Sequence, residues 1–394
     1  MSITLLIASS DEHFRELIRD NLLNVQGAKV AAEYPEVSGN LYIRVLQDLE
    51  RYPDAALFID LSGDPEAGLK AMERVKQAVP DLYIVASNYS GDGDTVIASM
   101  RSGANDYLVQ PVKRLEFRDA IARLERAPRR STAGAAASKL GKIYTFLGAK
   151  GGVGTTTLAV NFASVLAQRK QTPVLLDLDW SANECAMQIG SSPQYTLNEV
   201  GENLSRMDQS LFEGFVTRDP LGFFLVGPPD SLEQRAYFTE PMFRDFANFL
   251  VEKYDSVIID AGRSLSDEVT VGALQSSSVV FLVMTQDFPA IRNAQRYISA
   301  LVRLGFNQDQ LRIVVNQYQK RNSPNYASLD QIRQTLNQPV FYGVPSSPHV
   351  LNSINRGRPF VTNREAAPDL DRSFRAFVDK ATGKDQAKQA AKAS

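Results

Sequence analysis

Short apolar runs alternate with amphipathic stretches in the first part of the chain. The apolar runs predict strands at Ile3–Ala8, Ala55–Asp60, Leu82–Ala86 and Asp106–Val109. Apolar residues at helical spacing predict helices at Phe14–Leu23, Leu69–Val79, Thr95–Arg101 and Leu115–Leu124. Strands and helices that alternate in this way predict an α/β fold, in which helices cover both faces of a parallel sheet.

The same alternation resumes after a segment of small and polar residues at 127–139. Further strands are predicted near 143–147, 173–177, 223–226, 256–260, 279–284, 311–315 and 340–342. We therefore expect two doubly wound parallel-sheet domains, at 1–126 and 140–380, joined by a linker at 127–139. The Ala-, Lys- and Gln-rich segment 381–394 is predicted to be a flexible tail.

The composition is that of an ordinary soluble protein and argues against several classes. The 394 residues carry a formal net charge of −2, and 44% of them are apolar. The single cysteine, Cys185, excludes an intrachain disulfide framework, and with 2 histidines a His/Cys metal cluster is not expected. No apolar run has the length of a membrane span, and the N-terminus shows no export signal. We expect a cytoplasmic protein, and the near-neutral charge does not favour nucleic-acid binding as its main function.

A glycine-rich segment between a predicted strand and a predicted helix has the features of a phosphate-binding loop. Its glycines let successive backbone N–H groups point at an anion, and the helix N-terminus adds partial positive charge. The candidate nucleotide-binding residues are Lys150, Gly151, Gly152, Val153, Gly154, Thr155, Thr156 and Thr157. The common form of this loop has a lysine where Thr155 stands, followed by a hydroxyl that holds Mg²⁺. Lys150, ahead of the glycines, is the only lysine of this loop.

Acidic residues follow two later apolar runs. Asp177 and Asp179 lie two positions apart where one predicted strand ends, and Asp260 ends another, as in the Walker B pattern. If the first strand persisted, alternation would send Asp177 and Asp179 to the same face, but loop geometry can also aim them separately. These carboxylates are candidates for holding a metal and positioning water.

Two further residues are candidates for recognising a base. Asn316 follows the predicted strand near 311–315, and its side-chain amide can pair with the edge of adenine. Pro345 lies in a predicted loop at 344–350, ahead of the segment 354–360. Each has an ordinary alternative, because asparagine often forms turns and proline often ends strands.

Together, the glycine loop, the two acidic motifs and the base-side elements resemble the MinD/ParA family of dimerising ATPases, whose signature is a lysine ahead of the glycine pair. The resemblance covers about 141–378. It implies that ATP or ADP and Mg²⁺ are the cofactors and that the domain forms a homodimer. The implied catalytic residues are Lys150, Asp177 and Asp179, and the implied metal residues are Thr156, Asp179 and Asp260.

In that family the signature lysine reaches the phosphates of the partner subunit. One of the two aspartates of the second motif bonds the metal shell, and the other positions the attacking water. Because Thr155 brings no charge to the phosphates, we expect weakened nucleotide binding and slow or absent hydrolysis.

The first 126 residues resemble the receiver domain of two-component response regulators. Asp60 stands at the end of an apolar run, where receivers carry the phospho-accepting aspartate. The metal-binding acids of the family are replaced by Ser9 and Ser10, and its lysine is replaced by Gln110. The alternative is that Asp60 is phosphorylated with Asp11, just beyond the serine pair, as a substitute metal ligand. Since phosphoryl transfer to a carboxylate needs a metal and a cation, we predict an interaction module that is not phosphorylated.

An atypical receiver in front of a MinD/ParA-type domain resembles the TadZ/CpaE pilus-assembly proteins, and this likeness covers essentially the whole chain. It implies a nucleotide-binding localisation hub for a Flp-type (tight adherence, type IV) pilus secretion machine. The implied partners are the pilus secretion ATPase and inner-membrane pilus components. The implied location is the cytoplasmic side of the inner membrane at a cell pole.

Two other functions are considered. A ParA-type partition ATPase would need a basic surface, for which Arg292, Arg296 and Arg303 are candidates, although solvated surface charges explain them equally. A signalling response regulator with an ATPase output would need phosphorylation of Asp60.

The C-terminal region has apolar residues at helical spacing. Leu370, Phe374, Phe377 and Val378 share one face of a predicted helix within Asp369–Lys380. MinD relatives contact lipid through a C-terminal amphipathic helix. Docking onto the core of the domain explains the same pattern, so membrane contact is expected to be indirect or through a weak C-terminal helix.

Overall fold

The computed structural model describes residues 3–37, 41–127, 140–193, 195–229, 238–304, 306, 310–319 and 325–383. It forms two compact units, Met1–Lys139 and Leu140–Ser394. Nearly all of the predicted linker, and the tail beyond 383, lie outside the described residues. Within those described ranges, no helix is both long enough and apolar enough to cross a membrane.

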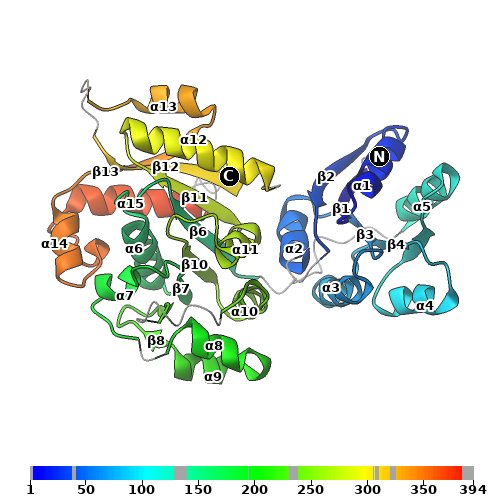
Figure 1. The fold of residues 1–394 in the computed structure, drawn as a ribbon, viewed down its shortest axis with the longest axis horizontal. Coiled ribbons are helices and arrows are strands. Elements are labelled where there is room, and N and C mark those ends of the chain that lie inside the picture. The colour runs from blue at the N-terminus through cyan, green and yellow to red at the C-terminus, as the bar shows by residue number, and fades with distance from the viewer. Residues whose placement is uncertain are drawn as a thin grey trace, which may run out of the picture. The chain divides into compact units, whose positions relative to one another are not determined.

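The first unit contains a five-stranded sheet in the order β2-β1-β3-β4-β5, and every pairing in it is parallel. The strands are β1 (Ile3–Ala8), β2 (Ala28–Tyr34), β3 (Ala56–Asp60), β4 (Ile84–Asn88) and β5 (Asp106–Val109). Helices cover both faces of the sheet (Figure 1). This order is the flavodoxin-like arrangement, so the predicted fold class of this domain is confirmed.

The helices of this unit are α1 (Glu12–Leu22), α2 (Leu41–Arg51), α3 (Pro65–Ala78), α4 (Gly93–Arg101) and α5 (Arg114–Arg126). The sequence prediction lacks β2 and α2. Strand β2 lies at the sheet edge and is mostly half-buried, with Lys29 and Glu33 among its apolar residues, so its pattern is weak.

The second unit contains an eight-stranded sheet in the order β13-β12-β11-β6-β10-β7-β9-β8. Its strands are β6 (Lys142–Gly148), β7 (Pro173–Asp177), β8 (Thr217–Arg218), β9 (Phe224–Val226), β10 (Ser256–Asp260), β11 (Val279–Met284), β12 (Leu311–Tyr318) and β13 (Val340–Pro345). All pairings are parallel except that of the edge strand β8 with β9. The predicted parallel doubly wound sheet is therefore confirmed, with one short antiparallel strand added.

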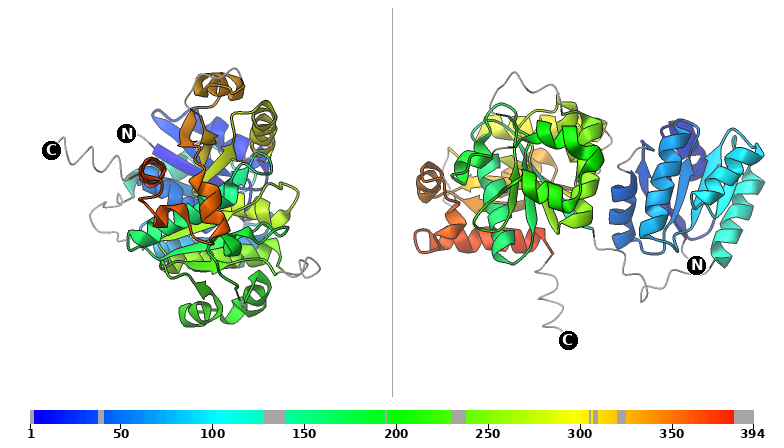
Figure 2. Two further views of the ribbon diagram at one scale, coloured as in Figure 1. Left: turned by 90° about the vertical axis from the view of Figure 1, so that its left-hand side faces the viewer. Right: turned by 90° about the horizontal axis from the view of Figure 1, so that it is seen from below.

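The helices of the second unit, and two short 3₁₀ segments, connect and cover these strands. They are α6 (Thr155–Gln168), α7 (Glu184–Gln188), α8 (Leu197–Asn203), η1 (Leu204–Arg206), α9 (Gln209–Phe215), α10 (Glu240–Lys253), α11 (Glu268–Ser276), α12 (Phe288–Arg303), α13 (Leu329–Leu336), α14 (His349–Asn355), η4 (Phe360–Thr362) and α15 (Pro368–Ala381). The views in Figure 2 show that helices lie on both faces of the sheet.

Helix α15 packs beside α6 over one face of the sheet. Its apolar residues Leu370, Phe374, Phe377 and Val378 are buried in the core cluster that also contains Phe162 of α6 and Phe281 of β11. The ring of Phe377 lies 5.8 Å from that of Phe162 and 5.2 Å from that of Phe281. The apolar face of this helix is thus part of the core, as the docking alternative expects.

Candidate functional site

The glycine loop lies between β6 and α6, as the sequence predicts, at the carboxyl ends of the central strands. Gly154 immediately precedes α6 with a φ of 86°, and a β-carbon there would lie 2.4 Å from the side-chain nitrogen of Asn316. Gly152 also has a positive φ, of 77°. Glycine adopts a positive φ without strain, and at Gly154 it also leaves space for Asn316. These two residues therefore let the loop curl and leave its backbone open to an anion.

The loop borders a cavity of about 760 Å³. Its lining includes most of the predicted nucleotide residues: Lys150, Gly151, Gly152, Gly154, Thr155, Thr156, Thr157, Asn316 and Pro345. The remaining one, Val153, is fully buried in the core instead. Tertiary folding has therefore brought residues from both ends of the domain around one space, next to the N-terminus of α6.

The two positions that distinguish this loop have different surroundings. The Thr155 hydroxyl oxygen lies 2.5 Å from the place of a β-carbon on Gly148, so it points back toward the base of the loop. Lys150 extends its ammonium group to Asp287, with 3.6 Å between Nζ and Oδ2. Asp287 is the N-cap of α12 and accepts a hydrogen bond from the Ala290 N–H. The signature lysine is thus held within its own chain.

A pair of carboxylates is buried beneath the loop. Asp177 and Asp260 end neighbouring strands β7 and β10 and lie in register. Burial and the nearby Asp260 carboxylate raise the pKa of Asp177 well above its ordinary value. Burial also raises the pKa of Asp260 to about 6, although a hydrogen bond with Thr156 opposes the rise. Among the described residues, no cation is a main contributor to either pKa shift, and two desolvated acids form a donor set suited to a hard divalent metal ion.

Cys185 belongs to this buried cluster, which sequence analysis did not predict. Its sulfur lies 3.7 Å from Oδ2 of Asp260, and its N–H donates to Asp177. Potential ligand atoms of Asp177, Cys185 and Asp260 lie within 4.8 Å of one another. Burial raises the pKa of the Cys185 thiol well above its ordinary value, so the thiol stays protonated and acts as a donor to the carboxylates.

The two aspartates of the second motif point in different directions. Asp177 is fully buried, whereas Asp179 lines the cavity. Oδ1 of Asp179 accepts from the Ser181 N–H at 3.1 Å, and its Oδ2 lies 2.9 Å from the place of a β-carbon on Gly262. Of the two geometries left open by the sequence, the loop therefore aims the carboxylates separately.

The base-side residues have structural partners as well. Asn316 donates from Nδ2 to the carbonyl of Val153 at 2.7 Å, and Gln317 donates to the carbonyl of Gly152 at 3.1 Å. These bonds brace the glycine loop and use one N–H of the Asn316 amide, so its second N–H and its Oδ1 remain for a base. Pro345 is the last residue of β13 and pairs in register with Tyr318.

These features fit a Mg²⁺-nucleotide group. The glycines keep the loop free of side chains that would occupy the space, and the loop lies at the N-terminus of α6. The hydroxyl of Thr156 is hydrogen-bonded to Asp260, and together they offer oxygen ligands. What this loop lacks is the cation that normally follows its last glycine.

The first unit has its own candidate site at Asp60, which is buried at the end of β3. Oδ2 accepts from the Ser9 hydroxyl at 2.6 Å, and Oδ1 accepts from the Gln110 amide and the Ser62 N–H, at 2.6 and 2.9 Å. Asp11 instead caps α1 by accepting from the His13 N–H. Neutral donors therefore occupy both oxygens of Asp60, and Asp11 is engaged elsewhere.

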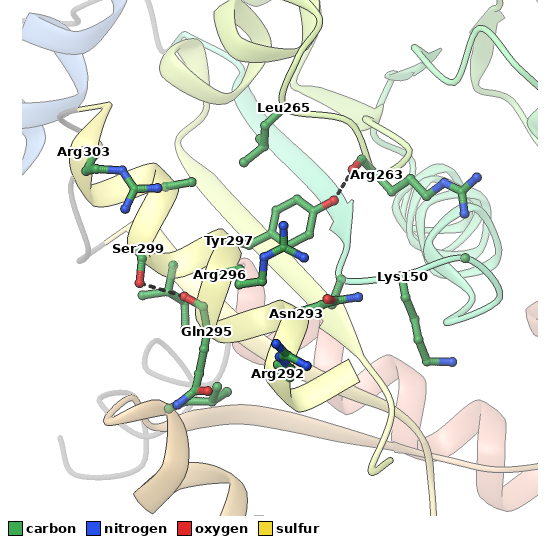
Figure 3. Close-up of a pocket in the computed structure, with 15 residues that line it drawn as sticks. Lys150, Arg263, Leu265, Arg292, Asn293, Gln295, Arg296, Tyr297, Ser299 and Arg303 are labelled. Carbon is green, nitrogen blue, oxygen red and sulfur yellow. Dashed lines mark hydrogen bonds between the residues drawn. The ribbon is translucent and has the colours of Figure 1, made fainter. Parts of the chain in front are cut away.

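A second, basic cavity of about 950 Å³ lies beside the glycine loop (Figure 3). Its basic lining residues are Lys150, Arg263, Arg292, Arg296 and Arg303, and none of the described lining residues is acidic. Arg292, Arg296 and Arg303 come from α12 and Arg263 from the loop after β10. The three arginines that the sequence singled out thus share one concave surface.

Arg263 and Asp287 are further residues that sequence analysis did not select. Each follows a predicted buried strand: Arg263 comes three residues after Asp260, and Asp287 precedes a Phe-Pro pair that opens a helix. Their positions after predicted strands could have drawn attention to them. However, an arginine or an aspartate at such a position does not by itself indicate which residue or ligand it contacts.

Comparison with known proteins agrees with this geometry. The family described as the CobQ/CobB/MinD/ParA nucleotide binding domain matches residues 144–360. A septum site-determining protein of the MinD type from Guillardia theta is 28% identical over 229 residues, which cover 57% of this chain and 82% of that protein.

Solved structures share the fold. A ParA family ATPase from Chlorobium tepidum matches with a TM-score of 0.56 and 21% identity, covering 60% of this chain and 98% of its own. The MinD protein of Pyrococcus horikoshii in complex with Mg-ADP matches with a TM-score of 0.53 and 17% identity, covering 61% and 96%. The chain belongs to the CobQ/CobB/MinD/ParA nucleotide-binding family.

Proposed function

We propose that this protein binds ATP or ADP with Mg²⁺ in its second unit, dimerises through that unit, and hydrolyses ATP slowly or not at all. The observation that carries the proposal is the glycine loop itself. Its cradle, its helix N-terminus and its neighbouring carboxylates are all present, but Thr155 stands where a lysine would meet the phosphates.

Each predicted residue has a role in this proposal. The backbone N–H groups from Gly151 to Thr157 hold the phosphates, and Asn316 and Pro345 border the base. Thr156, Asp179 and Asp260 hold Mg²⁺, which supplies charge neutralisation at the phosphate oxygens when bound. Asp179, which lines the cavity, positions water, while Asp177 lies behind Asp260 and tunes its charge.

Lys150 is the residue proposed to connect two subunits. In the single chain it is paired with Asp287, so reaching the phosphates of a second subunit requires that this ion pair open. A half-exposed pair of this length contributes about 1 kcal/mol or less, so opening it is a small cost. By holding Lys150 within its own chain, Asp287 would then make dimerisation less favourable.

At the level of the cell, we propose a localisation and assembly hub for a Flp-type pilus secretion machine. Its partners would be the pilus secretion ATPase and inner-membrane pilus components, and its place the cytoplasmic side of a cell pole. The support is a combination of two altered sites in one chain: the threonine in the glycine loop, and an Asp60 whose oxygens are held by Ser9 and Gln110. Both changes remove charge that phosphoryl transfer uses, and both favour assembly over turnover.

The test is calorimetry with ATP and ADP in the presence of Mg²⁺, combined with mass measurement in solution. Wild type is expected to bind nucleotide and to dimerise with ATP. Lys150→Ala should bind nucleotide in the monomer but fail to dimerise, whereas Asp287→Asn, which keeps a capping side chain, should dimerise at lower ATP concentration. A turnover of about 1 per second or faster would contradict the slow-hydrolysis part of the proposal. A wild type that binds neither nucleotide would refute the proposal as a whole.

The basic cavity on α12 favours one second candidate, a partition-type ATPase that contacts DNA. Its arginines carry positive charge, and the described part of the chain contributes no acid to its lining. This candidate predicts binding to DNA of any sequence that weakens steeply with salt and is lost when Arg292, Arg296 and Arg303 are replaced together by alanine. Binding that is absent at low salt would exclude it.

A further inference from the structure

Arg263 lies where a cation could act on the phosphates of the glycine loop. It follows the strand-ending Asp260 and the turn at Gly262, which has a φ of 56°. Figure 3 shows its side chain extending toward the loop that carries Lys150, while Arg292, Arg296 and Arg303 follow α12. Arg263 also lines both cavities, the one at the glycine loop and the basic one.

The backbone of this turn is tied to the glycine loop and to α12. The Gly148 N–H donates to the Gly262 carbonyl at 2.8 Å, and the Gly262 N–H donates to Asp260 at 3.2 Å. The hydroxyl of Tyr297, on α12, donates to the carbonyl of Arg263. The base of the Arg263 side chain is therefore held in place relative to the loop.

The guanidinium group lies against the loop itself. A β-carbon on Gly151 would be 2.6 Å from Nη1 of Arg263. A side chain at position 151 would thus have to displace this group, so the glycine leaves room for the arginine as well as for a phosphate. Asp179 packs against Gly262, so the turn that carries Arg263 lies next to one of the residues proposed to hold the metal.

The charge of Arg263 is not neutralised within the described part of the chain. No carboxylate there forms an ion pair with it, whereas Lys150 is paired with Asp287. A guanidinium group stays protonated at all relevant pH values and can bind two oxygens of one phosphate at once. Of the two cations that line the loop cavity in the described part of the chain, Arg263 can meet an anion without first breaking an ion pair there, whereas Lys150 must leave Asp287.

We propose that Arg263 supplies, from the loop after β10, the phosphate-binding charge that Thr155 does not supply from the start of α6. The inference rests on the proposed function, since it assigns a role at the same nucleotide site. Because Arg263 lies beside Asp179 and Lys150, its contact is with the terminal phosphate. It therefore favours triphosphate over diphosphate.

The test compares Mg-ATP and Mg-ADP binding by the full-length wild type, Arg263→Ala, Arg263→Gln and Arg263→Lys. Loss of a charge-assisted contact predicts about a 10- to 100-fold weaker ATP affinity for Arg263→Ala and Arg263→Gln, and a smaller loss for ADP. Arg263→Lys should retain part of the affinity. Arg303→Ala is the matched control, because Arg303 lines only the basic cavity, and it should bind ATP as wild type does.

Adding Thr155→Lys to Arg263→Ala should restore ATP binding, because the charge returns from the other side of the loop. Thermal unfolding checks that each variant is folded, and Arg263→Gln keeps the length of the side chain if Arg263→Ala proves unstable. Wild-type affinity in the folded Arg263 variants would overturn the inference and leave the proposed function standing. Failure of wild type to bind any nucleotide would overturn the proposed function itself, and this inference with it.

Discussion

Asp60 and Asp260 each end a buried strand, but their surroundings give them different chemistry. Both oxygens of Asp60 are held by neutral donors from Ser9 and Gln110. Asp260 instead lies next to Asp177, a second desolvated carboxylate. The hydrogen-bonding needs of Asp60 are met by residues of the chain, whereas Asp260 and Asp177 form a pair of acids that a bound cation would stabilise.

Asp60 is expected to resist phosphorylation. Because Ser9 and Gln110 occupy its oxygens and bring no charge, neither Mg²⁺ nor a cation is positioned to neutralise an incoming phosphoryl group. Incubation with acetyl phosphate and Mg²⁺ should leave the intact mass of the protein unchanged. A stoichiometric phosphoryl adduct that disappears in Asp60→Asn would contradict this prediction.

The stability of the metal-free protein is expected to fall as pH rises from about 4 to 7. The pKa of Asp260 in the folded state, about 6, is above its ordinary value of 3.8, so the folded state binds this proton more tightly than the unfolded state. The contribution is present below the unfolded pKa and is lost as pH rises through the folded pKa. Its size is about 3 kcal/mol.

Urea unfolding with a metal chelator, across this pH range, measures the effect. Asp260→Asn should flatten the pH dependence and be more stable than wild type near pH 7.5. Equal slopes for the two proteins would show that Asp260 does not titrate in the folded state with a raised pKa.

At the scale of elements, α15 completes the core of the second unit. Its buried rings contact α6 and β11, and its residue Asp371 pairs with Arg375 along the helix. An apolar face that is packed in the core is not free to enter a lipid surface. The amphipathic pattern of this helix is therefore explained by docking.

Phe377→Ala should lower the free energy of unfolding by about 3–5 kcal/mol, because it leaves a cavity among several rings. Arg372→Ala is the control, since its side chain is 81% exposed, and it should change stability by about 0.5 kcal/mol or less. Chemical unfolding measures both. Flotation of the folded wild type with anionic liposomes that requires residues 368–394 would contradict the docking interpretation.

At the scale of the whole molecule, each unit has a hydrophobic core of its own. One core surrounds β1 and β3, and the other surrounds β6 and α6. Units that have separate cores generally fold independently. The altered Asp60 site and the glycine loop therefore lie in separately folding parts of the chain.

Fragments 1–139 and 140–394 should each unfold cooperatively on their own, with midpoints near those of the corresponding transitions in the full chain. Circular dichroism and calorimetry of the fragments and of the full chain provide the comparison. A fragment that shows no cooperative transition would mean that its fold depends on the rest of the chain.

Much of the architecture could be predicted because it is encoded locally. Apolar runs ending in Asp60, Asp177 or Asp260 indicate buried strands, and the glycine loop between β6 and α6 is defined by neighbours in sequence. Strands with weak local patterns were missed or shortened. Examples are the edge strand β2 and the two-residue β8, whose pairing depends on partners elsewhere in the chain.

The sequence by itself determined the two α/β domains, the phosphate-binding loop and the absence of its lysine at Thr155. Only the tertiary structure decided which groups meet: Ser9 and Gln110 at Asp60, Cys185 with Asp177 and Asp260, and Arg263 over Gly151. Hydrophobic periodicity records whether a position is buried, and it does not record which distant residue lies opposite. That information comes from strand order and loop path, so it appears only when the whole chain is folded.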